Sequence, residues 1–282
     1  MKIGLIGNNI STSNAPDIHI RLAKIFQIPL EYLLFDLKDK EENYFEVLLE
    51  ELRVAGFKGV NITFPFKEKV IKHVDNISKN SRNVGSANTL IFRKKITAQN
   101  TDYTGFLKTY NFHFGKNTPG TILVLGAGGV SRAVTFALAS LGVEKIFLTD
   151  KDKLKVGSLS RDLSLLNINC VVTKPDQIEK IISSFDGIIN CTPVGHYDFP
   201  GCPLGNLMPS KKQWIFDAVY TPAKTNFIKK GEQVGAKIIS GIDLFVFQAI
   251  DAFLYFTEKK NDHNLTNHIH KLRKHYFDKL YI

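Results

Sequence analysis

The chain of 282 residues has no long apolar run, and this absence excludes the membrane proteins built from helices. No stretch approaches the ~18 consecutive apolar residues that a membrane-spanning helix needs. The amino terminus, MKIGLIGNN, has a single lysine and a five-residue apolar run. A secretory signal peptide needs an apolar region of about 7 to 15 residues. We therefore expect a cytoplasmic protein without a membrane partner.

Cysteine is also scarce, with only Cys170, Cys191 and Cys202 in the whole chain. Their number is odd, and their spacing is not typical of metal ligands. A chain of this length buries a core without disulfide bonds. We expect reduced, structural thiols and no metal site.

Long runs of one charge are missing as well, although the chain carries a formal charge of +10 and a pI near 9.3. A positive field attracts an anionic partner. The lysines are spread over the sequence, and no five like charges follow one another. This pattern favours an ordinary solvated surface over a nucleic-acid face, and a small anionic substrate or cofactor would also benefit from the field. The basic tail from Lys271 to Lys279 keeps nucleic acid as a weaker alternative.

Short apolar strands alternate with helical stretches along the chain, which predicts βαβ units and mostly parallel sheets. KIGLI, YLLFDL and GVNITF form a first series, followed by a hairpin-like pair, TLIFRK and ITAQN. A second series starts at TILVLGAGG and includes KIFLTD, NCVVT, DGIINCT, QWIFDAV and AKIISG. The segment GKNTPG, with its Gly and Pro residues, lies between the two series, so a domain boundary is expected within 104–120. From LFVFQAIDAFLYF onward the pattern is helical, and the tail is a basic amphipathic helix.

The most specific local signal is TILVLGAGGVSRA, an apolar strand that leads through glycines into a helix. Glycines allow a diphosphate to approach the backbone, and the helix start offers unpaired N–H groups. This context predicts a Rossmann-like dinucleotide site. Its contact residues are Gly126, Ala127, Gly128, Gly129 and Val130. The stretch KIGLIGNN also has two glycines after a strand, but Asn-Asn follows them, and we do not interpret it as a dinucleotide site.

The next strand ends in Asp150, 24 positions after Gly126. An acid near this spacing binds the adenosine ribose hydroxyls and favours NAD over NADP. Lys151 follows directly and could neutralise the extra phosphate of NADP, so both cofactors remain open, with NAD preferred. A simpler reading is that Asp150 and Asp152 cap the following helix.

Polar side chains gather where other strands end, in GVNITFPFKEKV, VGSANTL and AQNTDYTG. Asn, Thr, Lys and Asp supply the donors and acceptors that a polyol requires. Each residue alone is more typical of a turn than of a ligand site. Together with the dinucleotide turn, they indicate an oxidoreductase acting on a polyol.

Seven segments in collinear order resemble motifs of the shikimate and quinate dehydrogenase family, over residues 3–257. NITFPFK, VGSANTL, QNTDYTGF and GAGGVSRA are four of them, and the others are INCTPVG, DAVYTPAKT and FQAIDAF. The resemblance implies a cytoplasmic, NAD(P)-dependent enzyme of the chorismate pathway of aromatic amino acid biosynthesis. Its substrate would be a small anionic cyclic polyol. The sequence is silent on the oligomeric state, and monomer and homodimer both remain open.

The same resemblance implies site residues and domains. Lys67 and Asp102 would be the catalytic pair. The implied substrate-binding residues are Ser13, Thr63, Asn88, Tyr220 and Gln248, and Thr192 and Gly241 would contact the cofactor. The implied fold is a two-domain α/β protein. Residues 1–104, completed by 242–282, would bind substrate, and residues 105–241 would form the Rossmann-like doubly wound domain.

Three positions depart from the family pattern. Ala15 stands where a second hydroxyl that binds the substrate carboxylate is usual, His196 where a methionine is common, and Asp243 where shikimate-specific members have glycine. Shikimate, quinate or both therefore remain possible substrates. A related dehydrogenase for another cyclic polyol, and a dinucleotide-binding regulatory protein with a degraded site, remain as alternatives. Retention of both Lys67 and Asp102 argues against the latter.

Overall fold

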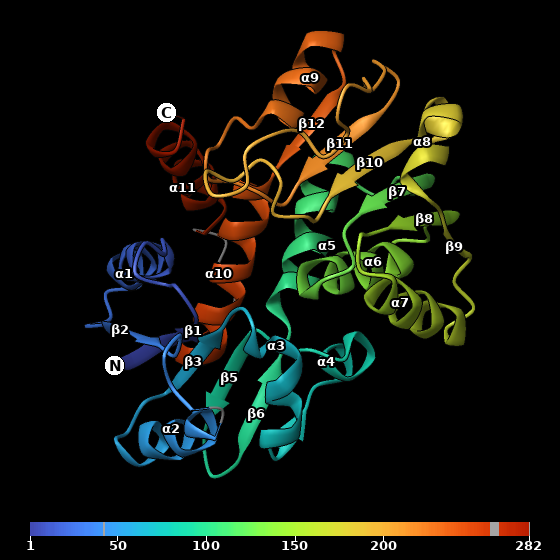
Figure 1. Cartoon of the computed structure of the whole chain (residues 1–282). Helices are drawn as coiled ribbons and strands as arrows, with labels where there is room; N and C mark the ends of the chain where they lie inside the picture. Colours follow the sequence, from blue (N-terminus) through green and yellow to red (C-terminus); the bar gives the residue numbers. More distant parts are fainter. Residues whose placement is uncertain (42, 260–264, 282) are drawn as a thin grey trace. The chain divides into compact units, whose positions relative to one another are not determined.

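The computed structural model describes residues 1–41, 43–259 and 265–281, and the chain divides into two compact units. Unit 1 consists of Met1–Gly105 and Phe247–Leu265, and unit 2 of Phe106–Val246 and Thr266–Ile282. Two long helices, α5 (Thr101–Phe114) and α10 (Gly241–Thr257), contribute residues to both units (Figure 1). Within the described ranges, no helix has both the length and the apolar character needed to span a membrane.

Unit 1 contains a mixed six-stranded sheet in the order β2-β1-β3-β5-β6-β4. The first three strands are parallel, and β5 and β6 form the antiparallel pair that the sequence predicts. The strands are β1 (Lys2–Gly7), β2 (Glu31–Asp36), β3 (Gly59–Ile62), β4 (Asn76–Ile77), β5 (Thr89–Phe92) and β6 (Ile96–Gln99). The carboxyl ends of β1 and β3 therefore lie at one edge, where the loops with Ser13 and Thr63 begin.

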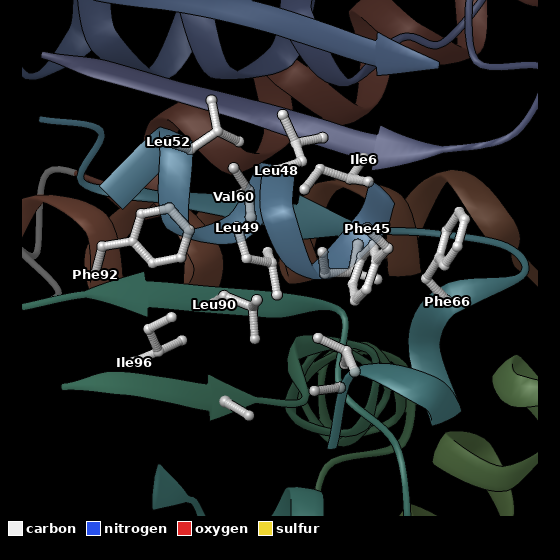
Figure 2. Close-up of a cluster of buried hydrophobic side chains, with 14 of the residues drawn as sticks. Ile6, Phe45, Leu48, Leu49, Leu52, Val60, Phe66, Leu90, Phe92 and Ile96 are labelled. Carbon is white, nitrogen blue, oxygen red and sulfur yellow. The ribbon is translucent and has the colours of Figure 1, made fainter. Parts of the chain in front are cut away.

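Helices cover both faces of this sheet. Alternate residues of a strand point to opposite faces, so Val60 and Ile62 join the core with α2 (Tyr44–Val54), shown in Figure 2. The other face packs Ile3 and Leu5 against Phe256 of α10. The remaining helices of unit 1 are α1 (Ala15–Ile25), α3 (Phe66–Lys69), α4 (Lys79–Val84) and a 3₁₀ turn at Val70–His73.

Unit 2 contains a parallel six-stranded sheet in the order β12-β11-β10-β7-β8-β9. The strands are β7 (Thr121–Leu125), β8 (Lys145–Thr149), β9 (Cys170–Val172), β10 (Gly187–Asn190), β11 (Trp214–Asp217) and β12 (Lys237–Ser240). Numbered within the unit, the order is that of a Rossmann fold, and it reverses between β7 and β10. The predicted fold class is confirmed.

The helices of unit 2 also pack on both faces of the sheet. Helices α8 (Pro175–Ile181) and α9 (Asn226–Val234) cover the face that carries Leu123 and Ile215. On the other face, α5 packs aromatic rings against β11, with Phe106 against Phe216. The remaining elements are α6 (Gly129–Ser140), α7 (Lys153–Leu165), a 3₁₀ turn at Ile182–Ser184 and α11 (Leu265–Lys279). Helix α11 buries Leu272 and Tyr276, which confirms the expected amphipathic tail.

Helix α5 was not expected from the sequence, and it runs into the stretch 104–120 where a boundary was predicted. Its amino terminus is fixed because Tyr103 N–H donates to Asn100 Oδ1 at 2.9 Å. Its buried residues include Phe106, Thr109 and Tyr110, which recur at the spacing of a helix face. The Pro/Gly punctuation lies after the helix, at Gly115 to Gly120.

Candidate functional site

Lys67 and Asp102 form an ion pair in unit 1, with Lys67 Nζ 2.6 Å from Asp102 Oδ2. Lys67 belongs to α3, which follows β3, and Asp102 to the first turn of α5. The two side chains are only 17% and 10% exposed. Burial of this degree reduces the screening of the pair by water.

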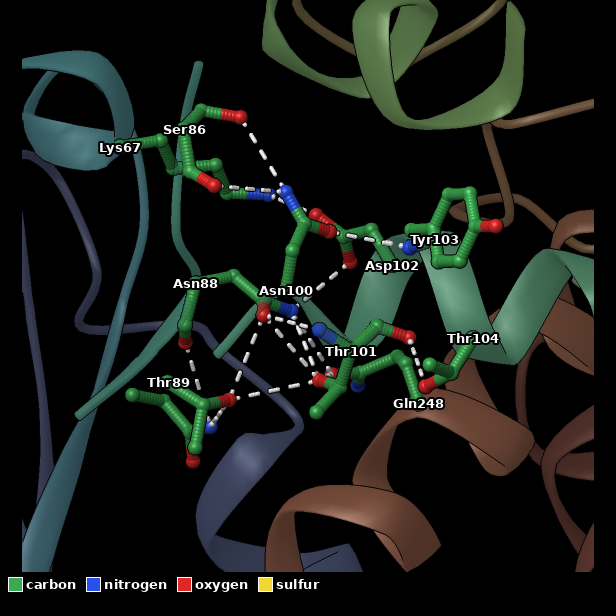
Figure 3. A network of polar contacts seen from close by, with 11 residues as sticks. Lys67, Ser86, Asn88, Thr89, Asn100, Thr101, Asp102, Tyr103, Thr104 and Gln248 are labelled. Atoms are coloured by element: carbon green, nitrogen blue, oxygen red, sulfur yellow. Dashed lines mark hydrogen bonds and ion pairs between the residues drawn. The ribbon is translucent and has the colours of Figure 1, made fainter. Parts of the chain in front are cut away.

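The Asp102 carboxylate is held on its other oxygen by Asn88, which follows α4 and precedes β5. Asn88 Nδ2 donates to Asp102 Oδ1 at 3.0 Å and to Thr101 Oγ1 at 2.9 Å. Asn88 Oδ1 accepts the Thr101 N–H at 2.7 Å, which fixes the direction of the amide. Gln248, on α10, places Oε1 3.4 Å from Thr101 Oγ1 and 3.5 Å from Asn88 Nδ2. Figure 3 shows these residues converging around Asp102.

Ser13 and Thr63 lie on the loops after β1 and β3. Ser13 Oγ accepts the Ala15 N–H at 3.2 Å, so its hydroxyl hydrogen can be donated elsewhere. The Thr63 backbone N–H donates to Ile6 O at 2.9 Å, and the Thr63 side chain packs closely on Gly7. A Cβ at Gly7 would stand 2.2 Å from Thr63 Cγ2, so glycine is required there.

The glycine-rich turn of unit 2 lies at the topological switch point, after β7 and beside the end of β10. Gly126 has φ +101°, and a Cβ on it would stand 2.8 Å from Cys191 C, so only glycine fits. At Gly128, by contrast, no described atom lies within 4 Å of the Cβ position. The backbone is thus open where a diphosphate would approach the start of α6, which comprises Gly129 and Val130 in its first turn.

Asp150 follows β8, and its carboxylate is bonded to backbone. Its Oδ2 accepts the Ala127 N–H at 2.6 Å, and its Oδ1 accepts the Asp152 N–H at 2.9 Å. The capping residue of α7 is Asp152, whose Oδ1 accepts the N–H groups of Leu154 and Lys155. A carboxylate has about four acceptor positions, so Asp150 can bond the turn and still accept ribose hydroxyls. Lys151 beside it is exposed.

Asp217, at the end of β11, connects two loops of unit 2 and was not singled out from the sequence. Its Oδ1 accepts from Asn190 Nδ2 at 2.8 Å and from Val219 N–H at 3.0 Å. Its Oδ2 accepts from Thr225 Oγ1 at 2.5 Å. Burial raises the pKa of Asp217 to about 7, although these three donors act in the opposite direction. Asn190 in turn accepts the Thr192 hydroxyl at 2.6 Å.

The other proposed contact residues of unit 2 lie near this group. Gly241 packs on the backbone that follows β11, because a Cβ there would stand 2.6 Å from Asp217 O. Tyr220 stacks on Phe245 with ring centroids 4.8 Å apart. The sequence motifs DAVYTP and SGID thus contribute to one end of the unit 2 sheet.

Asp243, which departs from the family pattern, is a structural ion-pair residue of unit 2. His113 Nε2 lies 2.6 Å from Asp243 Oδ2, and Arg273 Nε donates to Asp243 Oδ1 at 2.5 Å. Burial alone raises the pKa of Asp243, but the bonds and charges of His113 and Arg273 outweigh it and keep the pKa below its usual value. These contacts connect α5, α10 and α11. They give the residue a role that does not require a degraded site.

The residues of unit 2 fit a dinucleotide: an open glycine turn, a helix of 12 residues behind it and an acid after the second strand. Unit 1 adds a lysine and a carboxylate in contact. Fold and site together define a two-unit α/β protein of the NAD(P)-dependent oxidoreductase class.

Comparisons with known proteins identify the family within this class. Residues 5–90 match the family model "Shikimate dehydrogenase substrate binding domain". The chain is 32% identical over 266 residues to a shikimate dehydrogenase (NADP(+)) of Arthrobacter sp., covering 92% of this chain and 90% of the relative. It is 30% identical to a quinate/shikimate dehydrogenase (NAD(+)) of Corynebacterium efficiens, covering 92% and 94%. The chain therefore belongs to the shikimate and quinate dehydrogenase family.

Solved structures agree with this assignment. Quinate dehydrogenase from Corynebacterium glutamicum, in complex with NAD, superimposes with a TM-score of 0.89 at 27% identity, covering 99% of both chains. Shikimate dehydrogenase from Aquifex aeolicus superimposes with a TM-score of 0.83 at 28% identity, covering 95% and 97%. The fold is thus shared along nearly the whole length of this chain.

Proposed function

We propose that this chain interconverts shikimate and 3-dehydroshikimate, and quinate and 3-dehydroquinate, with NAD(P) as the second substrate. The contact of 2.6 Å between Lys67 Nζ and Asp102 Oδ2 is the observation that carries this proposal. The family relationship and the names of the relatives support the substrate class. A small anionic cyclic polyol also suits the positive charge of the chain.

The proposed reaction transfers one proton and one hydride. A bound nicotinamide dinucleotide would accept the hydride when the CH–OH carbon is oxidised. The Lys67 ammonium that pairs with Asp102 would first release a proton to water, and the neutral Nζ would then accept the hydroxyl proton as the carbon loses its hydride. In the reverse direction the Lys67 ammonium would return that proton to the carbonyl oxygen. Asp102 would hold both the ammonium and the reacting hydroxyl in place.

The remaining unit 1 residues would recognise the substrate. Ser13 would donate its free hydroxyl hydrogen to the substrate carboxylate, and Asn88 and Gln248 would contact ring hydroxyls. The polar groups already held around Asp102 support this assignment, because a pocket for a polyol needs preformed donors and acceptors. Thr63 would also contact the substrate, and Tyr220 of unit 2 is proposed as a further substrate-binding residue.

We assign substrate binding to residues 1–104, completed by 242–282, and cofactor binding to residues 105–241. In the second region the diphosphate would bind Gly126, Ala127, Gly128, Gly129 and Val130, and Thr192 and Gly241 would border the nicotinamide half. Asp150 would accept the ribose hydroxyls and repel the phosphate of NADP, so NAD is the preferred cofactor. The bonds from Ala127 and Asp152 to this carboxylate support the assignment, because they hold it at the turn.

A substitution of Lys67 tests the proposal directly. Lys67→Met removes the base and leaves an unbranched side chain that is one atom shorter, and the control Lys72→Met removes an exposed lysine of the next turn. We expect the turnover of Lys67→Met to fall about 10²- to 10⁴-fold, the usual contribution of general acid–base catalysis. Substrate binding, measured by calorimetry, should change far less. Near-normal turnover of Lys67→Met would refute the assignment of the base.

A further inference from the structure

A line of hydrogen bonds behind the ion pair starts at Tyr32 on β2 and ends at Asp102. The Tyr32 hydroxyl donates to Asn61 Oδ1 at 2.9 Å, and Asn61 Nδ2 donates to Thr89 Oγ1 at 3.2 Å. Asn61 is only 6% exposed, and its amide is used at both ends. It also places Nδ2 3.4 Å from Asn88 O.

The line continues in the same direction beyond Asn61. Because Thr89 Oγ1 accepts from Asn61, its own hydrogen is available to Asn88 Oδ1, 3.3 Å away. Asn88 Nδ2 then donates to Asp102 Oδ1 at 3.0 Å. Every bond from Tyr32 to the carboxylate thus points its donor toward Asp102. Hydrogen bonds arranged in this way polarise one another and strengthen the last member.

Asn61 buries an amide on an apolar face of the sheet, which costs free energy and therefore indicates that the amide has a function. Asn61 lies on β3 directly opposite Thr89 of β5, on the sheet face where β1 carries Ile3 and Leu5. An apolar residue would suit such a face, because burial of an amide costs free energy unless every bond is made. The chain places a fully bonded amide there instead.

The groups at the far end of the line keep one protonation state near neutral pH. Burial raises the pKa of Tyr32 well above 10, so its hydroxyl remains a donor. His19 stacks on Tyr32 with ring centroids 5.0 Å apart. Burial lowers the pKa of His19 to about 3, although a bond to Asn61 acts in the opposite direction. The line therefore presents the same donors to Asp102 over the whole working range of pH.

We propose that Asn61 is a positioning residue for catalysis: through Thr89 and Asn88 it orients the donor that holds the Asp102 carboxylate toward Lys67. The inference rests on the proposed function, because it assigns Asn61 a part in the proton step. Loss of the Asn61 donor weakens the bond from Thr89 to Asn88 Oδ1, although Thr101 still holds that oxygen. Asn88 then binds the Asp102 carboxylate less firmly, and small misplacements of a catalytic group reduce turnover strongly. Substrate affinity, which depends on other groups, changes less.

The test breaks the line at two neighbouring links. Asn61→Leu removes the amide at similar volume, Thr89→Val removes the next hydroxyl, and Thr89→Ser restores it. The control Ser81→Ala removes a buried hydroxyl of unit 1 that bonds Ser78 and Ala98 O instead. We expect kcat to fall about 10- to 100-fold in Asn61→Leu and in Thr89→Val, with KM within about 3-fold. The double variant should be no slower than either single variant, because both break one line.

The outcomes separate the inference from the proposed function. Recovery of kcat in Thr89→Ser, together with a wild-type kcat in Ser81→Ala, supports the positioning role. Wild-type turnover in Asn61→Leu and Thr89→Val would overturn it and leave the proposed function intact. Equal losses in Ser81→Ala, or additive losses in the double variant, would reduce Asn61 to a structural residue. If Asn61→Leu does not fold, Thr89→Val decides alone. A wild-type chain without turnover would overturn both proposals.

Discussion

Replacement of Asp217 by asparagine should make the stability of unit 2 less dependent on pH. Asp217 is buried, and its pKa lies at about 7 rather than 3.8 because burial disfavours the charged form. The folded chain therefore holds a proton between these values that the unfolded chain has lost. This stabilisation is complete below about pH 4 and disappears as the pH rises through 7.

The size of the effect follows from the shift. A shift of about three pKa units corresponds to about 4 kcal/mol of unfolding free energy, at about 1.4 kcal/mol per unit. Of this unfolding free energy, about 3 kcal/mol is lost between pH 5 and pH 8, a range in which unfolding can be measured. The amide that replaces the Asp217 carboxylate can still accept from Asn190 and donate to the Thr225 hydroxyl, so the bonds of the site survive the change.

The assay is urea unfolding followed by the fluorescence of Trp214, the single tryptophan, on the same strand as Asp217. The difference in unfolding free energy, wild type minus Asp217→Asn, should decrease by about 3 kcal/mol from pH 5 to pH 8. Other titrating groups affect both proteins equally and cancel in the difference. Two curves that remain parallel across this range would refute the reasoning.

Three further predictions concern unit 2. Gly128→Ala should fold normally but bind dinucleotide at least about 10-fold more weakly, whereas Gly126→Ala should lower the melting temperature. Equal melting temperatures of the two variants would contradict the steric argument. Asp150→Ser should raise the ratio of NADP to NAD efficiency by about 10-fold or more, measured as kcat/KM, and an unchanged ratio would remove Asp150 from cofactor selection. Asp243→Asn should destabilise the chain by about 3 kcal/mol at pH 7, because it breaks two buried ion pairs. This loss of stability should disappear as the pH falls from about 4 through the lowered pKa of Asp243, where the wild-type carboxylate is also protonated; a loss that does not change with pH would exclude the ion pairs as its cause.

Features that repeat along the chain were predictable from the sequence, because they depend on local periodicity. The strand series, the β5–β6 hairpin and the glycine turn were predicted, and the structure confirms them. Helix α5 was missed because its first residues, Thr101 and Asp102, belong to a polar motif that resembles a turn. The cap from Asn100 and the spacing of Phe106 and Tyr110 could have indicated the helix.

Side-chain partners far apart in sequence could not be predicted. The departure at Asp243 suggested an altered site, but its partners His113 and Arg273 lie 130 and 30 residues away, and only the fold brings them to it. In the same way, Asn61 is part of a recognisable motif, while its bonds to Tyr32 and Thr89 depend on strand register. The sequence indicates which residues are polar; the sheet decides which of them are connected.

Initial rates with shikimate and with quinate, each with NAD and with NADP, test the central claim most directly. The assay uses the purified protein as the enzyme and follows the absorbance of the reduced cofactor. We expect turnover with both substrates and a higher kcat/KM with NAD than with NADP. No turnover with any of the four pairs, despite measurable dinucleotide binding, would contradict the assignment as a dehydrogenase.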